Sequence, residues 1–198
     1  MSEILSVSTY WLIYFFLHSL FASTWMKDKV ESVWPDGLRY YRIVYNLLSS
    51  AGLLYILFHL ATTPSEFVFA KHEYLQFTGL ALSTWGLIIL KQSFRHYSIR
   101  EFLGLRQYHE QSQLSLAISG ILNYVRHPLY SGTILIVGGL FLFNPKVLML
   151  ATFVCVVVYI LIGIQLEERK LEKEFGDQYR EYKKKVPMLI PRWKRNHH

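Results

Sequence analysis

Cysteine is almost absent from this sequence: its 198 residues include one, Cys155. No disulfide framework can form within the chain, so cysteine usage does not indicate the redox compartment. Charged residues are also scarce, at 18% of the chain, whereas about a quarter is usual for a soluble domain. Hydrophobic residues make up 52%, and they are gathered in long runs. This pattern indicates an integral membrane protein.

Five apolar runs divide the chain, and each is near the roughly 20 residues that a helix needs to cross a bilayer. We therefore expect an all-α membrane protein with about five transmembrane helices. The runs cover residues 9–25, 43–61, 74–90, 129–143 and 147–166. The fourth is short, which leaves open whether that helix crosses completely. Three residues separate it from the fifth, and such a tight connection predicts an antiparallel helical hairpin.

The segment 167–185 is charged, yet apolar side chains recur in and just after it at spacings of three and four. They are Leu171, Phe175, Tyr179, Tyr182 and Val186. This spacing predicts an amphipathic C-terminal helix, with Gly176 as its weak point. The whole chain, 1–198, is interpreted as one membrane domain. Its first part, 1–92, holds three helices, and 93–195 holds the other two and the amphipathic helix.

Lysine and arginine are concentrated after the first and third runs and in the C-terminal tail. The positive-inside rule then predicts an inner or cytoplasmic membrane protein with its N-terminus outside and its tail in the cytoplasm. The first residues carry Glu3 and no basic cluster, so we expect no cleavable signal peptide. Basic loops that contact anionic lipid account for the net charge of +7, and we expect no nucleic-acid partner.

A polar cluster, 123–132, stands where a cytoplasmic segment enters the fourth run. Pro128 favours a helix start there and disfavours helical geometry at His127. Arg126 and His127 would then lie at the membrane boundary, beside helix N-terminal N–H groups that suit a carboxylate. An equally good interpretation has Arg126 on lipid phosphate, Tyr130 in an interfacial belt and His127 as a cap.

Adjacent carboxylates, Glu167 and Glu168, end the fifth run. They could hold a cation such as an amino group or a sulfonium-bearing ligand, although such a pair more often marks where a helix leaves the bilayer. His18 and His59 lie within membrane runs, where they are functional candidates or neutral side chains bonded to a neighbouring helix. No histidine has metal-ligand spacing with a cysteine or carboxylate, so we expect no metal site.

The order of these motifs resembles the isoprenylcysteine carboxyl methyltransferase superfamily, which includes bacterial phospholipid methyltransferases and methanethiol S-methyltransferases. The resemblance covers roughly 115–191: the stretch 126–132, the hairpin, the glutamate pair, and the tail 175–187. In the N-terminal half, His18-Ser19 and the stretches 41–46 and 102–107 look more like the methanethiol branch than the prenyl-protein branch.

The resemblance implies that the cofactor is S-adenosylmethionine, held between the hairpin, the preceding loop and the tail. It implies two groups of lining residues: Tyr124, Arg126, His127, Pro128 and Tyr130 on one side, and Glu167 and Glu168 on the other. His127 and Arg126 are the catalytic candidates, with His18 as a weaker candidate for a base. A lipophilic acceptor would enter sideways from the bilayer.

One departure concerns the acceptor. The carboxyl-methylating branch is expected to place an arginine one turn before the glutamate pair, but here the turn 161–165 contains none. A buried carboxylate without a cation is costly, which favours a small thiol or another lipophilic acceptor. Alternatives are an isoprenylcysteine carboxyl or phospholipid methyltransferase, an NADPH-dependent membrane reductase, and a non-enzymatic membrane protein. The reductase would need further basic groups for the dinucleotide phosphates, which the chain lacks.

Overall fold

The computed structural model describes residues 1–94, 116 and 118–191, apart from the side chains of Asp36 and Arg39. The expected methanethiol-branch motif at 102–107 therefore lies outside the described residues. In the described part the secondary structure is helical, except for one isolated antiparallel bridge between Phe67 and Lys146.

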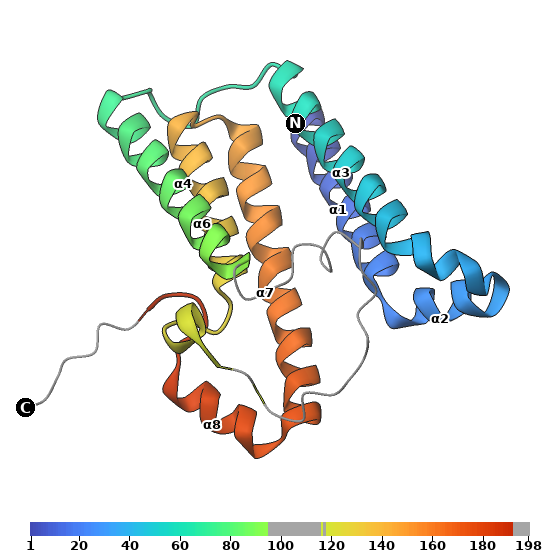
Figure 1. Ribbon diagram of the computed structural model, residues 1–198. Coiled ribbons are helices and arrows are strands. Elements are labelled where there is room, and N and C mark those ends of the chain that lie inside the picture. The colour runs from blue at the N-terminus through green and yellow to red at the C-terminus, as the bar shows by residue number, and fades with distance from the viewer. Residues whose placement is uncertain (95–115, 117, 192–198) are drawn as a thin grey trace, which may run out of the picture.

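The helices are α1 (Ser2–Ala22), α2 (Thr24–Val33), α3 (Leu38–Thr62), α4 (Glu73–Phe94), α6 (Pro128–Phe143), α7 (Val147–Phe175) and α8 (Asp177–Lys185). The long helices run side by side in Figure 1, from α4 through α6 and α7 to α1 and α3. Short 3-10 turns, η1 (Pro35–Gly37) and η2 (Gly120–Asn123), precede α3 and α6. As expected, α6 and α7 form an antiparallel pair across a tight turn, and each expected run lies within a helix or overlaps one.

The structure corrects the expectation of a single helix over 167–185. The helix α7 continues past the apolar run to Phe175, because Glu, Arg, Lys and Leu are all good helix formers. It ends at Gly176, whose φ of 54° is readily adopted only by glycine. The chain turns there, and α8 begins in a new direction beneath α7 (Figure 1).

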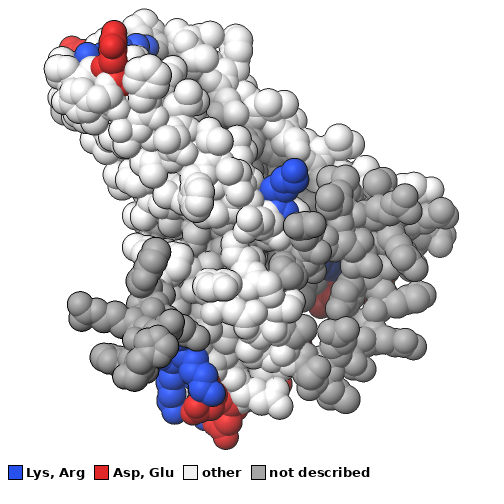
Figure 2. Space-filling model, turned by 60° about the vertical axis from the view of Figure 1, so that its left-hand side comes forward, with Lys and Arg blue, Asp and Glu red and all other residues white. Residues whose placement is uncertain are grey.

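Within the described residues, three helices are long and apolar enough to cross a membrane: Ser2–Ala22, Tyr40–Thr62 and Val147–Phe175. A further apolar helix, α6, is shorter. On the face seen in Figure 2, the charged side chains gather mainly near the two ends of the molecule, and few of them interrupt the white surface between these ends. Such a distribution is typical of a protein whose middle lies in hydrocarbon.

The closest helix packing joins α4 to α6, through glycines on both helices. A Cβ atom on Gly79 would lie 2.7 Å from the backbone N of Phe143, and one on Gly132 would lie 2.9 Å from the carbonyl O of Gly86. Small residues allow backbones to approach in this way in membranes. Of the adjacent glycines in α6, Gly138 faces Phe153 of α7, whereas Gly139 faces α4.

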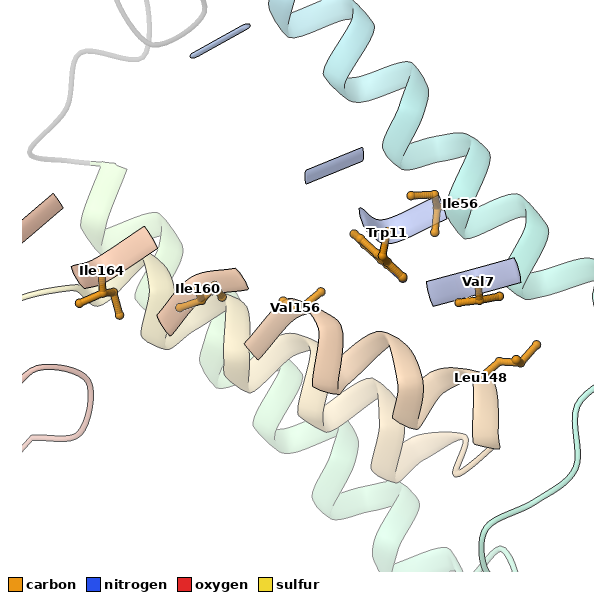
Figure 3. Packing of buried hydrophobic residues seen from close by; sticks show 7 residues of the cluster. All are labelled: Val7, Trp11, Ile56, Leu148, Val156, Ile160 and Ile164. Carbon is orange, nitrogen blue, oxygen red and sulfur yellow. The ribbon is translucent and has the colours of Figure 1, made fainter. Parts of the chain in front are cut away.

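The helix α7 carries the core that joins it to α1 and α3 (Figure 3). The buried cluster comprises Val7, Trp11, Ile56, Leu148, Val156, Ile160 and Ile164. The α7 members recur every four or eight residues, so they form one stripe along the helix. Trp11 also donates a hydrogen bond to Thr152 across 3.1 Å, which satisfies its indole N–H inside the cluster. The stripe places the polar end of α7 beside the start of α6.

Adjacent glycines in α6 give a matched test of the α4–α6 packing. Gly139→Ala would place its methyl 2.8 Å from the backbone N of Ser83, which cannot move aside. We expect it to destabilise the fold by about 1–3 kcal/mol, the usual cost of overpacking. Gly138→Ala meets only the Phe153 ring, at 3.2 Å, and should change stability little. Thermal unfolding in detergent measures both, and equal losses would contradict the packing described here.

Candidate functional site

The loop between η2 and α6 is held by Arg126. Its Nε donates to Oε1 of Glu168 across 2.9 Å, and its Nη2 lies 2.7 Å from the same oxygen. Its Nη1 donates to the carbonyl oxygens of Lys183, at 3.0 Å, and of Val186. Arg126 therefore connects the start of α6, the end of α7 and the end of α8. With these partners its guanidinium faces protein groups, and not lipid phosphate.

His127 is buried and lies against the glutamate pair. Its Nε2 is 3.0 Å from Oε1 of Glu168. A carboxylate only accepts hydrogen bonds, so Nε2 carries the proton in this contact. The other ring nitrogen, Nδ1, faces Oε2 of Glu167 at 3.8 Å. His127 has the non-helical backbone expected before Pro128, with φ −124° and ψ 65°, but its side chain makes no capping hydrogen bond.

Lys183 also belongs to the site, although it was not predicted from the sequence. Its Nζ lies 2.8 Å from Oε2 of Glu168 and 2.7 Å from Oε1 of Glu172. The hydrogen bond to Glu168, followed by that to Glu172, raises the pKa of Lys183. Lys183 stands within a run of three lysines, which hides it. A usable signal was its position four residues after Tyr179, on the buried face of α8.

The segment after α8 lies beside the start of α6. The backbone N–H groups of Arg126 and His127 donate to the carbonyl oxygens of Pro187, at 2.9 Å, and Met188, at 3.1 Å. The hydroxyl of Ser131 donates to the carbonyl oxygen of Leu189 across 2.7 Å. These two N–H groups are therefore occupied by protein, so any anion at this helix start must use later ones.

The structure brings four of the seven expected site residues into one cluster: Arg126, His127, Glu167 and Glu168. The ring of Tyr130 is next to it, with its centroid 5.7 Å from that of His127. Pro128 is buried as the first residue of α6. Tyr124 differs, because it is exposed at the end of η2.

The two glutamates differ in their surroundings. The side chain of Glu168 is 10% exposed and both of its oxygens are engaged by Arg126, His127 and Lys183. The side chain of Glu167 is 43% exposed, and its described contact is the long one to His127. Glu168 can therefore organise the cluster, whereas Glu167 is accessible to a ligand.

Tyr179 packs beneath the cluster. It is 1% exposed, and its hydroxyl oxygen has no hydrogen-bond partner within the described residues. Burial raises the pKa of Tyr179, and the negative charge of Glu168 raises it further. Tyr182 beside it donates a 2.6 Å hydrogen bond to the carbonyl oxygen of Leu122, which ties α8 to η2.

This arrangement defines an all-helical membrane protein with an ion-paired cluster at one end of its helices. A sequence model of the phospholipid methyltransferase family matches residues 74–178, about half of the chain and including the whole cluster except Lys183. The chain belongs to this family. The resemblance inferred from the motif order is thereby confirmed.

Curated relatives agree with this assignment. Methanethiol S-methyltransferase 1 of Bradyrhizobium diazoefficiens is 30% identical over 78% of this chain and 55% of its own length. Methanethiol S-methyltransferase of Crocosphaera subtropica is 30% identical over 88% of this chain and 69% of its own length. Protein-S-isoprenylcysteine O-methyltransferase B of Arabidopsis thaliana is 29% identical over 73% of this chain and 76% of its own length.

The matched region thus spans just over half the length of the first of these relatives. Comparison with solved structures gave no significant match. The names of the family and of the relatives both indicate methyl transfer, and relatives are named for a small thiol and for an isoprenylcysteine substrate.

The ion cluster can be tested by stability. Glu168→Gln removes the charge that Arg126 and Lys183 share, and it leaves the buried Arg126 without a carboxylate partner, while Lys183 keeps Glu172. Removing one partner of a buried ion pair costs about 3–5 kcal/mol, so we expect a large fall in the unfolding temperature. Glu181→Gln breaks an exposed pair with Lys184 and should cost about 0–1 kcal/mol. Similar losses in both variants would show that the cluster is not structurally important.

Proposed function

We propose that this protein is an S-adenosylmethionine-dependent methyltransferase of the membrane that methylates a small thiol or another lipophilic acceptor. The observation that carries the proposal is the cluster of Arg126, His127, Glu167 and Glu168, which lies inside the family-matched segment. Bound S-adenosylmethionine would supply a methyl group on a positively charged sulfur, an electrophile that needs alignment and a dry site.

Within this proposal the two glutamates have different roles. Glu167 is the carboxylate that would meet the amino or hydroxyl groups of the cofactor, because it is accessible. Glu168 and Arg126 would act as positioning residues, because their polar atoms are already paired. The rings of Tyr130 and His127 would line the other side of the cofactor, with Pro128 fixing the start of α6. Tyr124 remains a proposed lining residue at the exposed edge.

His127 is the proposed base. Its Nε2 is held by Glu168, so in the neutral ring Nδ1 carries the lone pair and faces Glu167. A thiol placed there would give its proton to Nδ1. Its sulfur would then form a bond to the methyl carbon while the carbon–sulfonium bond breaks, and the electron pair would stay on the cofactor sulfur. Because positive charge is lost at that sulfur, no acid is required.

The turn of α7 before the glutamate pair, 161–165, favours a neutral or thiol acceptor. The turn before the glutamate pair ends in Gln165, and the chain presents no arginine there. Leu161 and Ile162 are exposed, and a Cβ on Gly163 would meet just the Tyr130 hydroxyl, at 3.9 Å. This apolar and open face of α7 suits a lipophilic molecule that arrives from the bilayer.

The membrane arrangement is part of the proposal. We propose that α4 and α6 cross the membrane with α1, α3 and α7, which makes five spans. The N-terminus would lie outside, and the cluster and α8 on the cytoplasmic side of the inner membrane. The basic residues of α8, Lys183 to Lys185, support this orientation through the positive-inside rule.

Cofactor binding separates the candidate functions. We expect the detergent-purified protein to bind S-adenosylhomocysteine saturably in calorimetric titration and not to bind NADPH. Glu167→Ala should weaken binding at least tenfold, since it loses a charge-assisted contact worth about 1.5–3 kcal/mol. His127→Ala should also weaken binding, because it removes a ring that lines the proposed site and the Nε2 partner of Glu168. Glu174→Gln, an exposed change in the same helix, should bind as the native chain does. Binding of NADPH alone would favour a reductase, and binding of neither would favour a non-enzymatic role.

Acceptor class is tested by methyl transfer from a labelled donor. We expect label on a hydrophobic thiol, and much less on a farnesylcysteine free acid, because the carboxylate finds no arginine at Gln165. Gln165→Arg should raise transfer to the farnesylcysteine and leave cofactor affinity unchanged. A native enzyme that labels the farnesylcysteine faster than the thiol would contradict the thiol assignment, and one that labels phospholipid alone would make it a lipid methyltransferase.

A further inference from the structure

A groove follows the contact between α1 and α3, away from the ion cluster. It consists of two adjoining cavities of about 390 and 320 Å³, both lined by His18 and Phe21. The first cavity continues along the middle of the two helices. The second is lined in part by Lys27 of α2. In Figure 1, α2 lies toward the same end of the long helices as α8.

The longer cavity has apolar and aromatic walls. It is lined by Tyr14, Leu17, Leu48, Gly52 and Ile56, among others. Gly52 widens it, because a Cβ there would already lie 3.2 Å from the ring of Tyr14. A cavity of this shape and lining suits a hydrocarbon chain and offers little to a polar molecule.

The other cavity is the more polar of the two, and two cations line it. Lys27 of α2 and Arg42 of α3 both line it, together with Asn46 and Tyr45, and no described lining residue is a carboxylate. In the part of the chain that the structure describes, neither Lys27 nor Arg42 takes part in an ion pair. Two available cations on one cavity favour an anion with several oxygens, such as a phosphate diester.

At the junction between the two cavities, the ring nitrogens of His18 are within hydrogen-bond distance of other side chains. Tyr45 lies within hydrogen-bond distance of His18, at 3.1 Å, and Ser49 lies 3.3 Å from the same ring. His18 therefore needs no further partner, and it separates the polar end of the groove from its apolar part.

The position of α2 places the polar cavity at the depth of lipid head groups. Trp25 and Trp34, at either end of α2, are exposed, and Nζ of Lys29 lies 5.1 Å from the Trp25 ring centroid. Exposed tryptophans with neighbouring lysines are typical of the boundary between hydrocarbon and water. A lipid with its head at Lys27 and Arg42 would thus have its chain directed along the apolar part.

The groove is separate from the candidate methyl-transfer site. Tyr159 of α7 lies beside the groove: its hydroxyl is 3.0 Å from that of Ser19, and its ring centroid is 6.5 Å from that of His18. Tyr159 precedes Glu167 by eight residues, which is about 12 Å along a helix. None of the described residues that line either cavity belongs to the ion cluster.

We propose that the α1–α3 groove binds an anionic phospholipid of the surrounding bilayer, with its phosphate on Lys27 and Arg42 and one acyl chain along the apolar cavity. The lipid is a resident ligand and not the methyl acceptor. The site goes beyond the proposed enzymatic function and does not depend on it.

Native mass spectrometry of the full chain, released from detergent with added lipid, tests this directly. The probes are dioleoylphosphatidylglycerol and dioleoylphosphatidylcholine, which share their chains and differ in net charge. We expect tighter binding of the phosphatidylglycerol. Lys27→Gln and Arg42→Gln should each weaken it about fivefold, since one basic group near a lipid surface contributes about 1 kcal/mol. Lys29→Gln, the same change on the same helix but outside the groove, should have no such effect.

A second variant tests the apolar part. Leu48→Trp fills the longer cavity from an exposed position on α3, so it should weaken both lipids without unfolding the protein. Equal affinity for the two lipids, or an equal loss in Lys29→Gln, would overturn the proposal in favour of nonspecific lipid contact. Transfer of labelled methyl groups to the bound phosphatidylglycerol would also overturn it, because the groove would then hold the acceptor.

Discussion

The buried negative charge of Glu168 is the constraint on which the polar end of the molecule depends. A carboxylate with so little exposure is unfavourable unless cations and hydrogen-bond donors surround it. Arg126 and His127 supply those groups from one segment and Lys183 from another, far apart in the sequence. Satisfying one charge therefore joins the start of α6, the end of α7 and the end of α8. The candidate site forms where these segments meet.

The helices above the cluster are held by a different kind of contact. Glycines let the backbones of α4 and α6 approach closely, whereas branched and aromatic side chains fill the space between α7 and α1 with α3. Apolar packing of this kind involves few hydrogen bonds, but it fixes the rotation of each helix about its own axis. The rotation of α7 in turn directs Glu168 inward and leaves Glu167 at the surface of the cluster.

These two arrangements separate the positioning groups from the groups that can meet a ligand. The polar atoms of Glu168 and Arg126 are already paired within the protein, while Glu167 and the Nδ1 side of His127 are more open to a ligand. The groove between α1 and α3 follows the same principle. The ring of His18 has hydrogen-bond partners in Tyr45 and Ser49. Lys27 and Arg42, in contrast, form no ion pair within the described residues and can bind an anion. In both places, function is inferred from the groups that the fold leaves unpaired.

Much of the fold could be predicted from the sequence because it depends on local properties. Apolar runs gave the helices, Pro128 gave the start of α6, and the order of motifs gave the family, which the comparison confirmed. The division of the tail at Gly176 was missed as a boundary, although glycine had been noted there as a weak point. The number of membrane spans and their orientation stay predictions, since the described helices establish three that are long and apolar enough to cross.

The pairings between distant residues, in contrast, depend on how the helices pack. The sequence presents Glu167 and Glu168 as equivalent neighbours, and nothing local tells which one faces Arg126. It also presents Lys183 as one of three lysines. Adjacent residues on a helix point about 100° apart, so the packing of α7 against α1 and α3 selects one carboxylate for burial. The sequence alone thus determined which residues could take part in the site, and the packing of the helices determined how those residues are arranged.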